Sequence, residues 1–391
     1  MVNPVTLPLW PVFEDDERSA VDAVLRSGKV NYWTGPTCRA FERAWAERHR
    51  GVHSLAMANG SLTMDAAMRV MGLGPGDEVI VSPRSYVASA MCVALAGATP
   101  VFADVDADSG CVTVATLEAA RTSRTKAAIP VHIGGWPCDM PAIMAWAERH
   151  GILVMEDCAQ AHGATVAGRP VGTWGDFASW SFCQDKIMTT GGEGGMLSTP
   201  DERQYKDAWI YAQHGKDHDR AFGPHETGGS GFRWLVDHAG TNLRMTEMQA
   251  AIGLRQLAKL DTWLAARARN ATIMQESLRT MPFLRVPTTP TGHAHYRCVA
   301  FVEGPLVEAS ARRDRCLEAL RAAGVPGMYG SCSEIYRERF FADRGFAPAA
   351  PLPTALRLGA TSLTFLVHHT IDEAGMRQYA EAAASALSRV A

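Results

Sequence analysis

The stretch from residue 152 to residue 199 constrains what this chain can fold into and do more than any other segment. It begins with a continuous apolar run, Ile152 to Met155, which is followed by Glu156 and Asp157. An apolar run without polar alternation is typical of a parallel strand that is buried on both faces. Ligands of open α/β sheets bind outside the carboxyl ends of the strands, so we expect Asp157 to face a ligand.

The second half of this stretch places a lysine among small residues. A second apolar run, Phe177 to Phe182, precedes Lys186, and the glycine-rich segment 189–195 leaves few side chains that would obstruct a ligand. An activated lysine forms a Schiff base with an aldehyde, and the coenzyme pyridoxal 5'-phosphate (PLP) also needs an acid at its pyridinium nitrogen. Asp157 and Lys186 supply this pair. Taken singly, the acid would usually be a helix cap and the lysine a solvated surface group, so the prediction depends on their combination.

A phosphate site is predicted after the first expected strand. Gly60 and Ser61 follow Asn59 and open a helix, where backbone N–H groups and a hydroxyl can bind an anion. A serine before a helix is more often a plain cap, but beside Lys186 the motif favours phosphate binding. Two further polar side chains come from the central stretch. We expect Gln160 near the ring hydroxyl of PLP and Ser181 near its phosphate.

The central stretch resembles the sugar aminotransferases of the DegT/DnrJ/EryC1/StrS family, and with the other motifs the resemblance covers nearly the whole chain. The family pattern is Glu-Asp-x-Ala-Gln-Ala-x-Gly-Ala, then Phe-Ser-Phe, Lys and Thr-Thr-Gly-Glu-Gly-Gly, and the matching residues are Glu156–Ala164, Trp180–Phe182, Lys186 and Thr189–Gly195. Two departures are visible: Trp180 replaces Phe, and Gly191-Gly192 adds one glycine before Glu193. Neither departure removes a reactive group.

The resemblance also implies roles outside the central stretch. Tyr86 matches a position at which the family places an aromatic ring on the pyridine face, although core packing is the ordinary role of such a residue. Asn242 lies in Gly-Thr-Asn-Leu-Arg-Met and matches an asparagine that reaches the phosphate in the neighbouring subunit, or it is a simple turn residue. The resemblance therefore implies a homodimer with shared active sites. Weaker candidates for contacts with a diphosphate or a donor carboxylate are Lys29, His214, Arg233 and Tyr329.

The activity that the resemblance implies is PLP-dependent transamination. Glutamate or glutamine is the expected donor, and the expected acceptor is a keto sugar, usually nucleotide-linked, in amino-sugar biosynthesis for a surface polysaccharide or a secondary metabolite. Lys186 is the expected proton carrier, and Asp157 keeps the pyridinium protonated. Related enzymes aminate keto-cyclitols, and members with His in place of the lysine dehydrate sugars with the same coenzyme, so both activities remain alternatives.

Two other classes of protein are less consistent with the sequence. A non-catalytic, PLP-binding or scaffold protein with this fold would not need all of the reactive residues that the chain retains. A nicotinamide-dependent dehydrogenase would need a glycine motif that joins a strand to a helix, whereas Gly72–Gly76 precedes a strand.

The order of apolar segments predicts the fold. Seven strand-like runs between residues 54 and 198 alternate with helical stretches, which indicates an α/β protein with a mostly parallel seven-stranded sheet, the fold type I of PLP-dependent transferases by resemblance. A chain of 391 residues is too long for one core, so we expect a large PLP-binding domain (1–255) and a smaller C-terminal α/β domain (256–391). A capping box at Thr246 should begin a long helix that leads out of the first domain, and residues 346–353 should form a surface loop.

Composition limits the partners. A formal net charge of −3 provides no general attraction to nucleic acid or to anionic membranes, and no apolar run approaches the length of a membrane span. The nine scattered cysteines include no Cys-x-x-Cys pair, which favours reduced thiols over disulfides or a zinc site. The N-terminal residues lack the pattern of a signal peptide. We therefore expect a cytoplasmic enzyme without a metal site.

Overall fold

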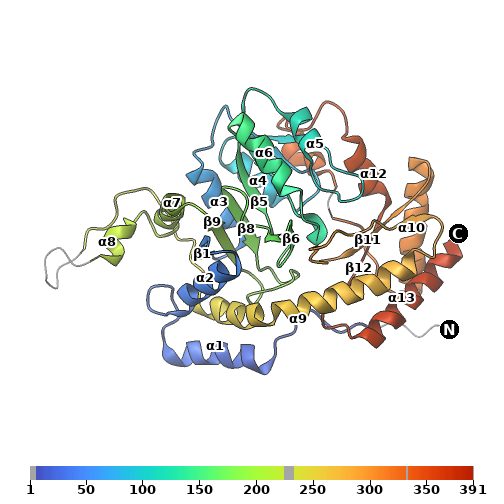
Figure 1. Cartoon of the computed structure of the whole chain (residues 1–391), viewed down its shortest axis with the longest axis horizontal. Coiled ribbons are helices and arrows are strands. Elements are labelled where there is room, and N and C mark those ends of the chain that lie inside the picture. The colour runs from blue at the N-terminus through green and yellow to red at the C-terminus, as the bar shows by residue number, and fades with distance from the viewer. Residues whose placement is uncertain (1–5, 224–232, 332, 391) are drawn as a thin grey trace.

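The computed structural model describes residues 6–223, 233–331 and 333–390. At its centre lies a seven-stranded sheet in the order β1-β9-β8-β5-β4-β2-β3 (Figure 1). All pairings from β3 to β8 are parallel, and β9 is antiparallel to both of its neighbours. The predicted mostly parallel sheet is confirmed, with strands β1 His53–Met57, β2 Glu78–Val81, β3 Thr99–Phe102, β4 Thr125–Ile129, β5 Leu153–Asp157, β8 Phe177–Ser181 and β9 Gly195–Thr199. A short hairpin, β6 Thr165–Val166 and β7 Arg169–Pro170, follows β5.

Helices cover both faces of this sheet. In β2, Val79 and Val81 pack into one buried cluster with α3, α4 and α7, whereas Ile80 packs into another with α5 and α6. Side chains alternate between the faces of a strand, so a sheet that is covered on both sides needs apolar residues at every position. This explains the apolar runs of the sequence. The helices are α3 Gly60–Val70, α4 Ala88–Leu95, α5 Val114–Ala120, α6 Met140–His150 and α7 Glu202–Ala212.

The long helix α9 (Glu247–Leu278) joins the large sheet to the C-terminal part of the chain, as Figure 1 shows. It begins with the predicted capping box, in which Thr246 accepts a hydrogen bond from the backbone N–H of Gln249. Its N-terminal half packs with α2 (Thr37–Arg48), and its C-terminal half contributes to a core that it shares with α13 (Glu373–Leu387). Helix α1 (Asp15–Ser27) also lies against α9.

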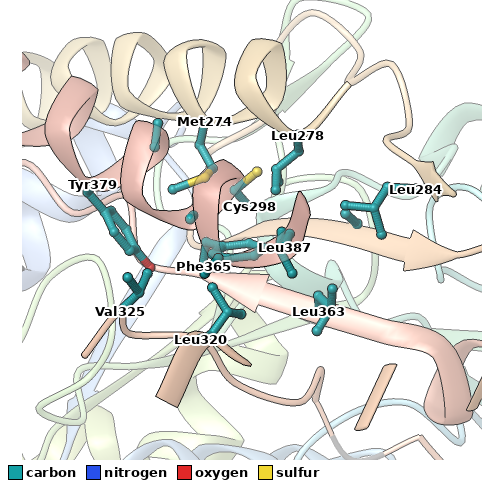
Figure 2. Close-up of a cluster of buried hydrophobic side chains, with 14 of the residues drawn as sticks. Met274, Leu278, Leu284, Cys298, Leu320, Val325, Leu363, Phe365, Tyr379 and Leu387 are labelled. Atoms are coloured by element: carbon teal, nitrogen blue, oxygen red, sulfur yellow. The ribbon is translucent and has the colours of Figure 1, made fainter. Parts of the chain in front are cut away.

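The C-terminal part has its own sheet and its own core. Strands β10 (Leu284–Arg285), β11 (Cys298–Val302) and β12 (Ser362–Phe365) form a three-stranded antiparallel sheet. Figure 2 shows how side chains from α9, α10 (Leu306–Ala322), α13 and these strands meet in one cluster. Residue 255 lies inside α9, and the division into domains 1–255 and 256–391 stays a prediction.

Four helices are not among the predicted elements. They are α7, α8 (His218–Phe222), α11 (Arg339–Ala342) and α12 (Pro353–Thr361). Helix α7 had a local signal, because the side chain of Asp201 caps it by accepting a hydrogen bond from the backbone N–H of Gln204. The chain pattern also predicts a helix near residues 86–96, but helix α4 begins only at Ala88, so Tyr86 precedes it.

The expectation of reduced thiols stays a prediction. The described residues include eight cysteines, all of them free, and Cys332 lies outside the described residues. Within the part of the chain that the structure describes, no helix is both long and apolar enough to cross a lipid bilayer.

The core of the C-terminal part is expected to depend on Leu320 of α10, which is 1% exposed. Replacing Leu320 by Ala should lower the free energy of unfolding by about 2–5 kcal/mol, because the lost methyl groups leave a cavity. Urea denaturation followed by circular dichroism measures the change. Val307 on the same helix is 82% exposed, and Val307→Ala should stay within about 0.5 kcal/mol of the wild type. Equal losses for both variants would contradict the packing seen in Figure 2.

Candidate active site

A cavity of about 610 Å³ opens at the carboxyl ends of β5 and β8. Asp157 is the last residue of β5 and Ser181 the last of β8, and these neighbouring parallel strands end at the same edge of the sheet. This is the edge at which α/β sheets bind ligands. The cavity is lined by seven of the predicted site residues: Gly60, Ser61, Tyr86, Asp157, Gln160, Ser181 and Lys186.

The carboxylate of Asp157 is buried, with only 4% of the residue exposed. One oxygen accepts a hydrogen bond from the Ser89 hydroxyl at 2.7 Å, and the other accepts from the Ala159 backbone N–H at 3.1 Å. Burial raises the pKa of Asp157, and the Ser89 hydrogen bond only partly opposes this effect. A cationic ligand group at this position would therefore stabilise the ionised form.

Glu156, the residue before Asp157 on β5, anchors this end of the strand. Both carboxylate oxygens of Glu156, which is fully buried, accept hydrogen bonds from the backbone N–H groups of residues 172, 174 and 175. The ring of His132 lies 3.2 Å from the same carboxylate. Glu156 therefore ties the loop before β8 to the strand that carries Asp157. These groups and Cys158 are close enough to suit a metal ion, but the Glu156 oxygens are already engaged.

Lys186 is held as an ammonium group by two neighbours. Its Nζ lies 3.3 Å from the carboxylate of Asp185 and 5.5 Å from the centre of the Tyr296 ring, and the Tyr296 hydroxyl donates to Asp185. Burial lowers the pKa of Lys186, but Tyr296 and Asp185 outweigh burial and hold this pKa above its ordinary value. The indole N–H of Trp10 donates to the Lys186 carbonyl at 2.9 Å, which fixes the backbone at this position.

The predicted phosphate site lies at the N-terminus of α3. The side chain of Asn59 caps this helix by accepting a hydrogen bond from the Leu62 backbone N–H at 3.0 Å. Gly60 is required there, because a methyl group on it would lie 2.7 Å from the Cβ of Ser181. The hydroxyls of Ser61 and Ser181 therefore line the cavity beside a helix N-terminus, which favours a bound anion.

Two further predicted residues lie around the same cavity. Gln160 accepts a hydrogen bond from the Gly134 backbone N–H at 2.8 Å, so that its NH2 group remains as the donor. Tyr86 is 70% exposed at the margin of the cavity, so its side chain does not have the core-packing role that was the alternative. Its stacking on a pyridine ring stays a prediction.

Asn242 is the one predicted site residue that does not line the cavity. It is exposed, and its side-chain oxygen accepts a hydrogen bond from the backbone N–H of Arg244 at 3.2 Å. A contact with the phosphate in a second subunit stays a prediction. Among the weaker candidates, only Tyr329 lines an adjoining cavity, whereas Lys29, His214 and Arg233 line neither this cavity nor the first.

The adjoining cavity measures about 280 Å³ and also reaches Lys186. It shares five lining residues with the first cavity and extends toward the three-stranded sheet. Its further lining includes Arg84 and Arg297. The two cavities together therefore leave room for a coenzyme and for a substrate on the other side of Lys186.

Ser89, Asp185 and Tyr296 belong to the surroundings of the site but were not predicted from the sequence. Asp185 stands next to Lys186, so its position in the sequence was a usable signal. Ser89 and Tyr296 are separated from their partners by 68 and 111 positions, and only the tertiary structure brings them into contact.

The residues of the first cavity fit PLP. The buried carboxylate of Asp157 suits a pyridinium, the helix N-terminus with Ser61 and Ser181 suits a phosphate, and Lys186 suits an aldehyde. Gly60 lets the start of α3 pack against Ser181, which keeps the helix N-terminus and the Ser181 hydroxyl at one wall of the cavity.

Comparisons with known proteins identify similar chains. The DegT/DnrJ/EryC1/StrS aminotransferase family matches residues 11–382. The solved structure of an aminotransferase from Psychrobacter cryohalolentis is similar with a TM-score of 0.94 and 43% identity, covering 98% of this chain and 100% of that chain. Spore coat polysaccharide biosynthesis protein SpsC of Bacillus subtilis (strain 168) is 35% identical over 80% of this chain and 79% of its own length. GDP-perosamine synthase of Caulobacter vibrioides is 44% identical over 59% of this chain and 58% of its own length.

Replacing Asp157 by Asn in the coenzyme-free protein should raise the unfolding temperature at pH 7. The pKa of Asp157 is raised in the folded state, so its ionised form destabilises the fold at neutral pH, and this penalty vanishes below the ordinary value of 3.8. The gain in unfolding temperature should therefore shrink as the pH is lowered toward that value, which differential scanning fluorimetry at several pH values measures.

Asp185→Asn is the control with the opposite sign. Burial raises the pKa of Asp185, but Lys186 and Tyr296 outweigh burial and the net shift is downward from 3.8. Its ionised form therefore stabilises the fold at neutral pH, and this contribution is lost as the pH falls through the lowered pKa. Asp185→Asn should lower the unfolding temperature at pH 7, and a change in the same direction as for Asp157→Asn would contradict these environments.

Proposed function

The chain belongs to the DegT/DnrJ/EryC1/StrS aminotransferase family, and we propose that it transfers an amino group from glutamate or glutamine to a nucleotide-linked keto sugar. The family is PLP-dependent, and we propose that this chain holds PLP in the larger of the two cavities. The observation that carries the proposal is the convergence of Lys186 and the buried Asp157 on that cavity, with the N-terminus of α3 at its wall.

PLP supplies an aldehyde that condenses with amines and a ring that accepts electrons. Asp157 would pair with the pyridinium, and Ser61, Ser181 and the start of α3 would bind the phosphate. The NH2 group of Gln160 would donate to the ring oxygen. Lys186 would bind the coenzyme covalently. Once displaced by the donor amine, it would carry a proton from the donor carbon to the former aldehyde carbon of the coenzyme, and in the reverse direction for the acceptor.

Asp185 and Tyr296 hold the Nζ of Lys186 inside the site while the lysine is not bound to the coenzyme. An ammonium group in this position cannot attack an aldehyde, so a proton must leave Lys186 before it binds PLP. The carboxylate of Asp185 stabilises the ammonium form, so its role is to hold the amine in place and not to take that proton.

The names of the relatives support the acceptor class. One relative is a GDP-perosamine synthase, and another is a spore coat polysaccharide biosynthesis protein. An acceptor that carries a nucleotide and leads to a polysaccharide is consistent with both names. A keto-cyclitol is the alternative acceptor, and sugar dehydration is disfavoured because the chain has Lys186 where dehydrating members have His. Activity with a panel of keto sugars and keto-cyclitols, with glutamate as donor, distinguishes these functions.

Replacing Lys186 by Ala should abolish the visible absorbance of the bound coenzyme that depends on the Schiff base. It should also lower the rate of transamination by at least about a thousandfold, because the covalent link and the proton carrier are both lost. Absorbance spectra with and without glutamate measure both effects. Lys126 is exposed on β4, and Lys126→Ala should behave as the wild type. Full activity of the Lys186 variant would overturn the assignment.

Asn242 provides a test of the proposed homodimer. If each site combines Lys186 of one chain with Asn242 of the other, both Asn242→Ala and Lys186→Ala proteins are inactive by themselves. In an equal mixture that has exchanged subunits, half of the dimers contain one chain of each variant. Each of these mixed dimers has one intact site of two, so about a quarter of wild-type activity should return. Activity that stays at the level of the separate variants would argue against shared sites.

A further inference from the structure

The smaller cavity has a lining that the binding of PLP does not explain. It lies between the carboxyl edge of the large sheet, which contributes Ser85 and Gln160, and the three-stranded sheet, which contributes Val299 and Thr364. Lys186 stands at the junction of the two cavities. A group bound here would therefore be adjacent to the atoms that react.

Positive charge predominates around this cavity. Its described lining contains the cations Arg84, Lys186 and Arg297 and one carboxylate, Asp185. With Lys186 linked to the coenzyme, Arg84 and Arg297 would remain as the cations of this lining.

Both arginines are held in place by their surroundings. Arg84 is only 4% exposed, and its side chain runs close to Gly110 and Gly330, where an added methyl group would lie 3.4 and 3.5 Å from its nitrogens. The guanidinium of Arg297 lies 4.6 Å from the centre of the Tyr296 ring. Among the described residues, no carboxylate forms an ion pair with Arg297. A fixed guanidinium is suited to bind a carboxylate or a phosphate through two parallel hydrogen bonds.

An independent observation comes from Thr364 on β12. Thr364 is 6% exposed and lines the cavity. Its hydroxyl oxygen has no hydrogen-bond partner among residues 6–223, 233–331 and 333–390. Buried polar groups are nearly always hydrogen-bonded in proteins, so a hydroxyl in this situation points to a polar ligand. The hydroxyl can donate to an oxyanion that the arginines also contact.

We propose that the smaller cavity is a substrate subsite that binds an oxyanion, a carboxylate or a phosphate, between Arg84 and Arg297, with the Thr364 hydroxyl as a further donor. The inference rests on the proposed function, in which donor and acceptor occupy the site in turn. A carboxylate would come from the amino donor, and a phosphate would come from the nucleotide of the acceptor. The arginines act as specificity-determining residues, because they bind the anionic group and leave the proton transfer to Lys186.

The test compares the PLP-loaded wild type with Arg297→Gln, Arg297→Lys and Thr364→Val. Arg315 on α10 is exposed and lines neither cavity, so Arg315→Gln is the matched control. The first measurement is the glutamate concentration that half-saturates the absorbance change of the coenzyme. The second is calorimetric binding of glutarate and, separately, of inorganic pyrophosphate, which does not require turnover.

Arg297→Gln is expected to weaken binding of the anionic probe by about tenfold to a hundredfold, because a hydrogen bond to a charged group is lost. The maximal rate of the reaction with glutamate should change less. Arg297→Lys should retain part of the affinity, and Thr364→Val, which keeps the packing, should weaken binding by about threefold to tenfold. Weaker glutarate binding identifies the donor carboxylate as the source of the oxyanion, and weaker pyrophosphate binding identifies the acceptor phosphate.

Unchanged affinity for glutamate, glutarate and pyrophosphate in folded Arg297→Gln and Thr364→Val would overturn the subsite. Failure of the proposed function has a different signature, since the wild type itself would then show no absorbance change with glutamate or glutamine. In that case the calorimetric comparison of the variants still decides whether the cavity binds an oxyanion. Equal weakening in Arg315→Gln would show a general charge effect and would also overturn the assignment.

Discussion

The burial of a carboxylate at the end of β5 is the constraint on which the site depends. Asp157 is held by the Ser89 hydroxyl and one backbone N–H, and burial raises its pKa. The strand that carries it is fixed from behind by Glu156, which binds the loop before β8. The large sheet therefore places an acid, at some cost in stability, at the position where a cationic ring nitrogen would satisfy it.

The surroundings of Lys186 favour its charged form, whereas those of Asp157 disfavour its charged form. Asp185 and Tyr296 stabilise its ammonium form, and Trp10 fixes its carbonyl. Tyr296 comes from the segment before β11, so the C-terminal part of the chain supplies one side of the environment of this lysine. The same segment supplies Arg297 to the smaller cavity. Helix α9 joins the large sheet, which carries Lys186, to the three-stranded sheet, which lines the proposed oxyanion site.

Much of this arrangement could be predicted from the chain itself. The parallel strands followed from apolar runs such as Ile152 to Met155, because a sheet that is covered on both faces leaves no position for polar alternation. Seven of the predicted site residues line one cavity, since they lie at or after the carboxyl ends of β1, β2, β5 and β8, which all end at the same edge of the sheet. The helices α7 and α12 were missed although α7 has a cap at Asp201, and Tyr86 proved to precede its helix.

The order of the residues alone determined the class of fold, the presence of Asp157 and Lys186 at one cavity, and the place of Gly60 at a helix start. These depend on local pattern and on strand ends, which the sequence carries directly. Only the tertiary structure decided which groups set the protonation of that pair, namely Ser89, Asp185 and Tyr296. It also decided that Arg84, Arg297 and Thr364 face one cavity. Such contacts join segments that are far apart in the chain, and they arise only when both sheets and α9 are packed together.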